Sequence, residues 1–525
     1  MNPFSSAVTQ DERSVLPPLE RRPPVYTFFD PAGRHVDEAS KAVELELLEI
    51  WRRAWWAQGF KPVVLSRSEA MNNHFYPLME KLELEADMEL ELMRWLAWGN
   101  MGTGILCNWL ALPMARHDHE FLSFLRRQEY TGLTRYEGLE SGLFVGTQEK
   151  VMSAIQEALA SSSLETAKSM YELAADLFMV ESADNGVAFY SSKTINEMYS
   201  PIGEKLRHDE TRAAGLAMLP PLINSHLQNT WQSNYPKGIA VLKPVAQNTT
   251  YMIDSAVGIA RNLSTCPASP IQASCPPNRP RCAPCVSTAP MIISTPPIFR
   301  NSSDLFTIGT VPHPYTLQSL MHTRESMDVR FIRRRTKRDA WVTAATKELL
   351  GTGISSFARL ADLKDAVASE FGSSRSLWLT AEDPVYLRTE RDMQEMDWIF
   401  GFAIPRQALK SGRSETPVPG PERRPPPPKQ EFDGPKPTEK QLRQQKSIGE
   451  SARETIKKGE KKGGERPFVM LRNAIEAWNM ADTEAWRFVR AYNARRQVER
   501  VKWQKEEEAY LGKGLVDRWR DTLAG

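Results

Sequence analysis

The chain has 525 residues, of which 41% are hydrophobic and 25% are charged, and its formal net charge is +2. This composition is typical of a globular protein, and so small a net charge excludes a chain-wide basic surface, so no nucleic-acid partner is expected. No apolar run reaches the roughly 18 residues of a membrane-spanning helix, and the N-terminal residues lack the apolar centre of a signal peptide. We therefore predict a cytoplasmic protein without a membrane span.

The N-terminal segment predicts an arm followed by the first unit of a parallel sheet. Residues 1–23 are polar and proline-rich, which is typical of a disordered arm. The run VYTFF predicts a buried strand over Val25–Phe29, and apolar residues at helical spacing predict a helix over 37–58 that ends at Gly59. KPVVLS predicts a second strand over 61–66. Strand, helix and strand in this order build parallel sheets.

The alternation of strands and helices continues beyond this unit. Apolar runs predict strands over 104–112 and 141–146, and the pattern that follows predicts a helix over 148–160. Such alternation indicates an α/β fold. We expect a mixed sheet sandwiched by helices in a first domain over residues 24–260.

The second half of the chain divides by composition. Residues 261–405 begin as a proline- and cysteine-rich crossover and continue as a second α/β region packed on the first. Residues 406–466 are rich in proline, lysine and glutamate, which predicts a disordered linker. Residues 467–525 show helical spacing of apolar side chains and predict a C-terminal helix. This helix could pack on the body of the protein or bind a protein partner from its tether.

Four cysteines in the crossover follow the spacing C-x8-C-x6-C-x2-C. The two-residue spacer of CAPC suits tetrahedral zinc, but the first two cysteines lack that spacing. Reduced thiols are usual inside cells, and disulfides are the third interpretation. The candidate ligands of a structural zinc ion are Cys266, Cys275, Cys282 and Cys285.

Several segments in this order resemble a known family. VYTFFDP, WRRAWWAQGF, KPVVLS, an asparagine-containing loop and a helix with Arg94 that runs into Gly102-Thr103-Gly104 are similar to the N-terminal half of GT-A glycosyltransferases. The segments also resemble uncharacterised fungal proteins. The resemblance covers residues 24–160 and implies the Rossmann-like fold of the nucleotide-diphospho-sugar transferases.

The resemblance also implies a site. It places Phe29 and Asp30 beside the nucleotide base and Arg94 near the pyrophosphate. The two aspartates that hold Mn or Mg in the family correspond to Asn108 and Leu110, a degenerate DxD motif in which the amide offers one weak oxygen and leucine offers none. The expected function is glycosyltransferase-like binding of a nucleotide sugar without a DxD metal site. The alternative is a catalytically inactive GT-A-fold protein that acts as a binding or scaffold protein.

Other charged residues could replace the missing carboxylates. Arg94 or the cationic run over 330–338 would offset the charge of the diphosphate. An acidic pair, either Glu137 with Glu140 or Glu382 with Asp383, would restore a metal site if it lies near Asn108.

Overall fold

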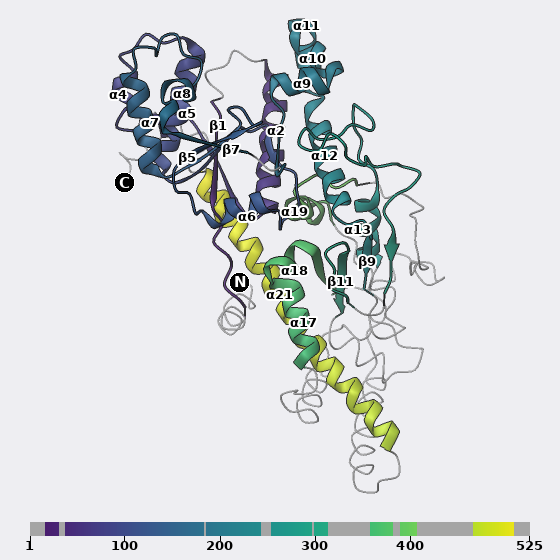
Figure 1. Cartoon of the computed structure of the whole chain (residues 1–525). Helices are drawn as coiled ribbons and strands as arrows, with labels where there is room; N and C mark the ends of the chain where they lie inside the picture. Colours follow the sequence, from purple (N-terminus) through teal and green to yellow (C-terminus); the bar gives the residue numbers. More distant parts are fainter. Residues whose placement is uncertain are drawn as a thin grey trace.

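The computed structural model describes residues 16–30, 37–182, 185–242, 254–296, 299–312, 357–381, 389–406 and 466–508 (Figure 1). The predicted linker, apart from its two end residues, lies outside the described residues. So do the cationic run over 330–338, Glu382 with Asp383, and residues 1–15 of the predicted arm.

The described part of the chain is mixed α/β, with two main sheets and a two-stranded ribbon. The strands are β1 (Pro24–Phe28), β2 (Lys61–Leu65), β3 (Gly104–Cys107), β4 (Ala111–Pro113), β5 (Leu133–Glu137), β6 (Leu143–Gly146), β7 (Phe178–Ser182), β8 (Val187–Phe189), β9 (Ile239–Val241), β10 (Ile293–Ser294), β11 (Phe306–Pro312) and β12 (Ser376–Ala381). The larger helices are α2 (Glu38–Ala57), α5 (Ala86–Met101), α6 (Glu120–Arg127), α7 (Gln148–Ala160), α12 (Leu219–Ser233), α13 (Asp254–Ser264), α17 (Phe357–Ala368), α19 (Glu390–Phe400) and α21 (Arg466–Glu508). Shorter helices are α3 (Arg67–Met71), α4 (Tyr76–Met79), α8 (Met170–Leu173), α9 (Ser192–Met198), α10 (Ser200–Arg207), α11 (Asp209–Leu216) and α18 (Glu370–Arg375), with a 3-10 turn at Ala175–Leu177.

The first sheet has the strand order β2-β1-β3-β6-β5-β7. β2, β1 and β3 are parallel, β6 is antiparallel to both of its neighbours, and β7 is parallel to β5. This confirms the expected mixed sheet, and the helices predicted over 37–58 and 148–160 are α2 and α7.

Alternate residues of the strands enter two different cores, because successive side chains of a strand point to opposite faces. Val25 and Val64 belong to a core that includes Trp51 of α2. Tyr26 and Val63 belong to a second core that includes residues of α5 and α7. Helices therefore cover both faces of the sheet, as Figure 1 shows.

The expected strand over 104–112 is two short strands in different sheets. Asn108 makes a turn between β3 and β4: its Oδ1 accepts a hydrogen bond from the Leu110 amide at 2.9 Å. An asparagine side chain that bonds the backbone two residues on favours a turn over an extended strand. β4 then pairs antiparallel with β8.

The second sheet is all parallel, with the order β10-β9-β11-β12. It begins with β9, so it includes residues before the predicted boundary at 261. Residues of both sheets, together with α2, α12 and α19, share one hydrophobic core. This shared core packs the second α/β region on the first.

The C-terminal helix α21 packs on the body of the protein. It runs beside both sheets in Figure 1, and Phe488, Val489 and Tyr492 join a core with Trp378. Nearer its end, Trp503 stacks on a tryptophan of α2. Of the two alternatives for this helix, packing on the body of the protein is the one found over these residues.

Residues 16–23 differ from the predicted flexible arm. Leu16 and Leu19 pack against the core that α21 forms with β12. Arg22 lies over the Trp56 ring at 3.8 Å and pairs with Glu499 of α21 at 3.3 Å. The apolar residues and Arg22 hold this segment in place despite its prolines.

Each described helix is too short or too polar to cross a lipid bilayer.

Candidate functional site

The candidate site lies at the topological switch point of the first sheet, where consecutive strands are added on opposite sides of β1. From β1 the chain passes to β2 on one side, and β3 then pairs with the other side of β1. In open α/β sheets, ligands bind beyond the carboxyl ends of the strands at such a switch point. Phe29 and Asp30 follow β1, and Asn108 follows β3, so the structure places these three predicted residues at one edge.

Two aromatic rings lie at this edge. Phe29 is buried, and its backbone amide donates to the Leu65 carbonyl at 2.8 Å, which continues the β1–β2 pairing. Its ring contacts Trp109 edge to face, with 6.2 Å between centroids. Trp109 is only partly buried. The edge therefore carries a partly exposed indole that packs against the buried phenyl ring.

An arginine that sequence reasoning missed completes the edge. Arg67 is the first residue of α3, and one residue, Ser66, separates it from the end of β2. Its Nε lies 3.1 Å from the Asp30 carboxylate, and its NH1 lies 3.4 Å from Glu89. The Asp30 side chain is 5% exposed, but the Arg67 side chain is 43% exposed. The sequence holds only part of this signal, a cation directly after the strand predicted over 61–66, because its partner Asp30 comes from the neighbouring strand β1.

Arg94 has a different environment from the one the resemblance implies. Its side chain is 11% exposed; it donates to the Ser141 carbonyl at 2.9 Å and pairs with Glu91 at 3.3 Å. The backbone amide of Asn108 donates a hydrogen bond to the Gly142 carbonyl at 2.8 Å. Arg94 therefore holds the loop against which Asn108 rests, and Arg67 is the more accessible cation.

Asn108 and Leu110, which only the resemblance aligns with a DxD motif, both make structural contacts. The Asn108 amide oxygen makes the turn to β4, and Leu110 packs against the main core. Glu137 ends β5 at the same edge, two strands from Asn108. Among the described residues, no group of three histidine, cysteine or acidic side chains is arranged to hold a metal ion.

The four crossover cysteines form two disulfides, which corrects the prediction of a zinc site. Cys266 pairs with Cys285, and Cys275 pairs with Cys282. A sulfur in a disulfide carries no thiolate for a metal, so the four residues are not zinc ligands in this structure. The nested pairing, first with last and second with third, depends on how the loop folds back and not on the two-residue spacer.

A buried chain of hydrogen bonds connects Tyr190, His226 and Ser274. The Tyr190 hydroxyl lies 2.7 Å from His226 Nδ1, and Ser274 Oγ lies 2.9 Å from Nε2. Ser274 also donates to the Ile271 carbonyl at 2.8 Å. Each hydrogen is used once if tyrosine donates to histidine, histidine to serine, and serine to the carbonyl. In this arrangement the histidine does not accept the serine proton, so the chain supports the crossover loop.

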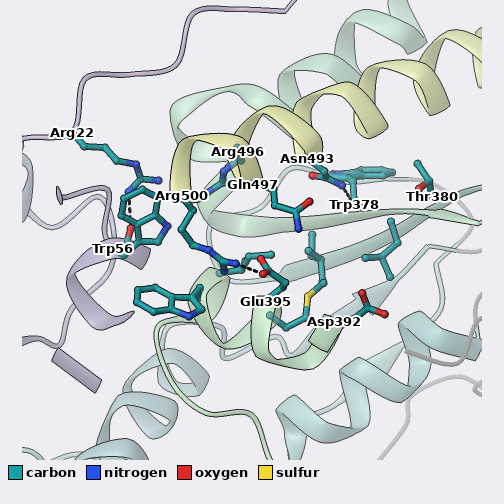
Figure 2. A pocket seen from close by; sticks show the side chains of 15 residues that line it. Arg22, Trp56, Trp378, Thr380, Asp392, Glu395, Asn493, Arg496, Gln497 and Arg500 are labelled. Carbon is teal, nitrogen blue, oxygen red and sulfur yellow. Dashed lines mark hydrogen bonds and ion pairs between the residues drawn. The ribbon is translucent and has the colours of Figure 1, made fainter. Parts of the chain in front are cut away.

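A cleft of about 260 Å³ lies between α21, α19 and β12 (Figure 2). Two of its arginines have acidic partners: Arg500 bonds Glu395, and Arg22 bonds Glu499. A third, Arg496, lies over the Tyr492 ring at 5.7 Å. Burial lowers the pKa of Arg22 to about 10, and Glu499 opposes this effect. Because Arg22 and Arg500 are paired within the protein, we interpret this cleft as the groove between α21 and the body on which it packs.

Comparison with known proteins gives one family. The model of the domain of unknown function DUF8765 matches residues 1–522. The chain belongs to the DUF8765 family. No curated protein and no solved structure matches it. Because the match spans both sheets and α21, the DUF8765 domain includes the entire arrangement described above.

Proposed function

We propose that this DUF8765 protein is a GT-A-like protein that binds a nucleotide sugar at the switch point of its first sheet, without a DxD metal ion. One observation carries the proposal: the carboxyl edge of β1, β2 and β3 gathers Asp30, Arg67, Asn108 and the Trp109 ring. Parallel sheets bind ligands at this edge, and a nucleotide needs the groups found there.

Each group suits one part of such a ligand. The partly exposed Trp109 ring would stack on the base, and the Asp30 carboxylate would accept hydrogen bonds from the base or the ribose. Arg67 would bond the diphosphate, because a guanidinium offers several donors in one plane. The phosphate would then compete with Glu89 for Arg67, since these two partners are both anionic.

The second candidate function is that of a catalytically inactive GT-A-fold protein, which binds a ligand or a partner but transfers no sugar. It is favoured by the positions that would hold the metal, because the Asn108 oxygen already bonds the backbone and Leu110 lies against the core. A transferase of this kind must stabilise the leaving diphosphate with cations alone. Arg67 is the most exposed cation that we place at the edge.

Calorimetry and thermal shift with a panel of UDP- and GDP-sugars test the proposal. At a hundred times the dissociation constant a nucleotide is expected to stabilise the protein by about 2.7 kcal/mol, in EDTA as well as in Mn²⁺. Arg67→Ala is expected to weaken binding about tenfold or more, because one charge-assisted bond is lost. Arg127→Ala, which removes an exposed cation of α6, is the matched control.

Each part of the proposal can fail separately. If no sugar nucleotide stabilises the protein, the site is not a nucleotide site. If binding requires Mn²⁺, carboxylates outside our assignment hold a metal. Bound nucleotide sugar that is neither hydrolysed nor transferred to an acceptor would favour the binding function over the transferase.

A further inference from the structure

A second concave site lies apart from the switch point, at the crossover loop. It is a pocket of about 430 Å³ whose lining includes three arginines and no carboxylate. We call it the crossover pocket. Its lining residues are Ala115, Arg116, His119, Asn185, Asn234, Asn278, Arg279, Pro280 and Arg281.

The Cys275–Cys282 disulfide closes the loop that carries two of these arginines. Between the two cysteines, Asn278 donates to the Met114 carbonyl at 3.1 Å and to the Asn185 carbonyl at 2.6 Å. Arg279 donates to the Ser233 hydroxyl of α12 at 3.1 Å. The short closed loop is therefore fixed to the first half of the chain on one side and to α12 on the other.

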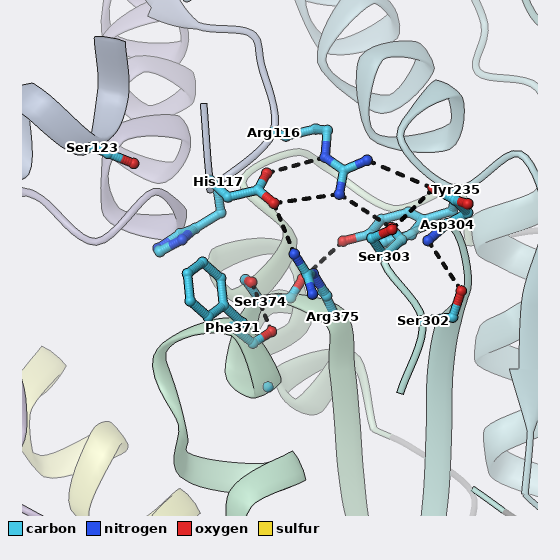
Figure 3. Close-up of polar contacts among 12 residues, drawn as sticks. Arg116, His117, Ser123, Tyr235, Ser302, Ser303, Asp304, Phe371, Ser374 and Arg375 are labelled. Atoms are coloured by element: carbon cyan, nitrogen blue, oxygen red, sulfur yellow. Dashed lines mark hydrogen bonds and ion pairs between the residues drawn. The ribbon is translucent and has the colours of Figure 1, made fainter. Parts of the chain in front are cut away.

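The surroundings of the pocket carry more cations than anions. Arg116 and Arg375 both pair with the Asp118 carboxylate, at 3.0 Å and 2.7 Å. Asp304 lies 3.9 Å from Arg116, and Figure 3 shows these two residues together with Arg375. Asp304 also pairs with Lys237 at 3.4 Å. The two carboxylates, Asp118 and Asp304, therefore pair with three cations, and none of these pairs involves the loop arginines Arg279 and Arg281.

The loop arginines add charge that these carboxylates do not balance. Among the described residues, Arg281 has no ion-pair partner, and the partner found for Arg279 is an uncharged hydroxyl. Arg281 is exposed, whereas Arg279 is half-buried. Three arginines thus line one hollow together with Asn185 and Asn234, and guanidinium and amide groups make its lining rich in hydrogen-bond donors.

We propose that the crossover pocket binds the phosphate group of a small phosphorylated ligand. Arginine suits this chemistry because its planar donors match phosphate oxygens in pairs. The pocket differs from the switch-point site in position: the Ala115 carbonyl in its wall accepts a hydrogen bond from Gln58, which lies before β2, whereas Asn108 lies after β3. The two sites therefore lie toward opposite edges of the first sheet.

The disulfide has a role in this proposal. A closed loop of this length holds the arginines near their binding positions before the ligand arrives, so less conformational entropy is lost on binding. Opening the loop is expected to weaken phosphate binding without removing any of the donors.

Calorimetry of the full chain with inorganic pyrophosphate at low ionic strength tests the proposal. We expect binding that the double variant Arg279→Ala/Arg281→Ala weakens about tenfold or more. The matched control is Arg207→Ala/Arg212→Ala, which removes two exposed arginines from α10 and α11. Arg67→Ala removes the cation of the switch-point site, and it is expected to leave unchanged the pyrophosphate binding that depends on Arg279 and Arg281.

The other outcomes overturn the proposal. No measurable binding, equal weakening by both double variants, or loss with Arg67→Ala alone would each mean that the crossover pocket is not a phosphate site. Equal binding of sulfate would mean that the site does not select phosphate. The variant Cys275→Ser/Cys282→Ser is expected to bind several times more weakly, and wild-type affinity in this variant would exclude the role of the disulfide.

Discussion

Replacement of Trp503 by alanine is expected to destabilise the protein by about 3–5 kcal/mol, the usual effect of removing a large buried aromatic side chain. The Trp503 side chain is almost fully buried. It stacks on Trp56 with 4.7 Å between ring centroids, and its indole nitrogen donates to the Pro62 carbonyl at 2.9 Å. Removal therefore leaves a cavity and an unpaired carbonyl between α21, α2 and β2.

The measurement is urea unfolding of the full chain, with Val498→Ala as the control. Val498 lies on the same helix and is 67% exposed, so its truncation is expected to change the free energy of unfolding by about 0.5 kcal/mol or less. If the two variants unfold alike, α21 does not pack on the body as described. Its apolar face would then be available to a protein partner.

Acidification is expected to destabilise the protein strongly between about pH 6.5 and pH 4. Burial lowers the pKa of His226 from 6.5 to about 4. Burial and the Arg126 charge lower the pKa of His117 to about 3, although Asp118 opposes this. Both imidazoles are therefore neutral in the folded protein at pH values where the unfolded chain binds a proton.

The sign follows from proton linkage. The stability that these neutral histidines contribute is complete above pH 6.5, and it is lost as the pH falls toward their folded pKa values. At about pH 4.5 each histidine is expected to cost roughly 2–3 kcal/mol relative to neutral pH. His226 has the clearer geometry, because protonation of Nδ1 would remove the acceptor for the Tyr190 hydroxyl.

Urea unfolding at about pH 7.5 and pH 4.5 measures this dependence. His226→Gln keeps a polar side chain but cannot titrate, so we expect it to reduce the loss of stability on acidification. His208→Gln, which removes an exposed imidazole, is the control. An unchanged pH dependence in His226→Gln would show that this histidine is not held neutral in the fold.

Part of the candidate site could be predicted from the sequence. Phe29 and Asp30 stand at the end of the strand predicted over 25–29. Asn108 was expected inside a strand over 104–112, and only the structure places it after the end of β3. Arg67 was missed because its importance comes from the neighbouring β1, where Asp30 meets it. The resemblance placed Arg94 near the pyrophosphate of a ligand, and only the structure shows that Arg94 donates to the Ser141 carbonyl.

The cysteines illustrate the same limit. Their spacing was compatible with zinc, free thiols and disulfides, since all three use sulfur atoms brought close together. The fold of the crossover brings Cys266 to Cys285 and Cys275 to Cys282. The order of the cysteines along the chain does not show which of them lie close together.

The sequence by itself determined the local elements of this protein, such as α2, α7 and the parallel strands β1 and β2, because the periodicity of buried side chains lies within each segment. Only the tertiary structure decided the strand order, the disulfide pairing, the arginines of the crossover pocket and the place of α21. Trp503 donates to Pro62 across 441 positions of the chain. Such a contact depends on how all the intervening elements pack, so it cannot be predicted from a local pattern of residues.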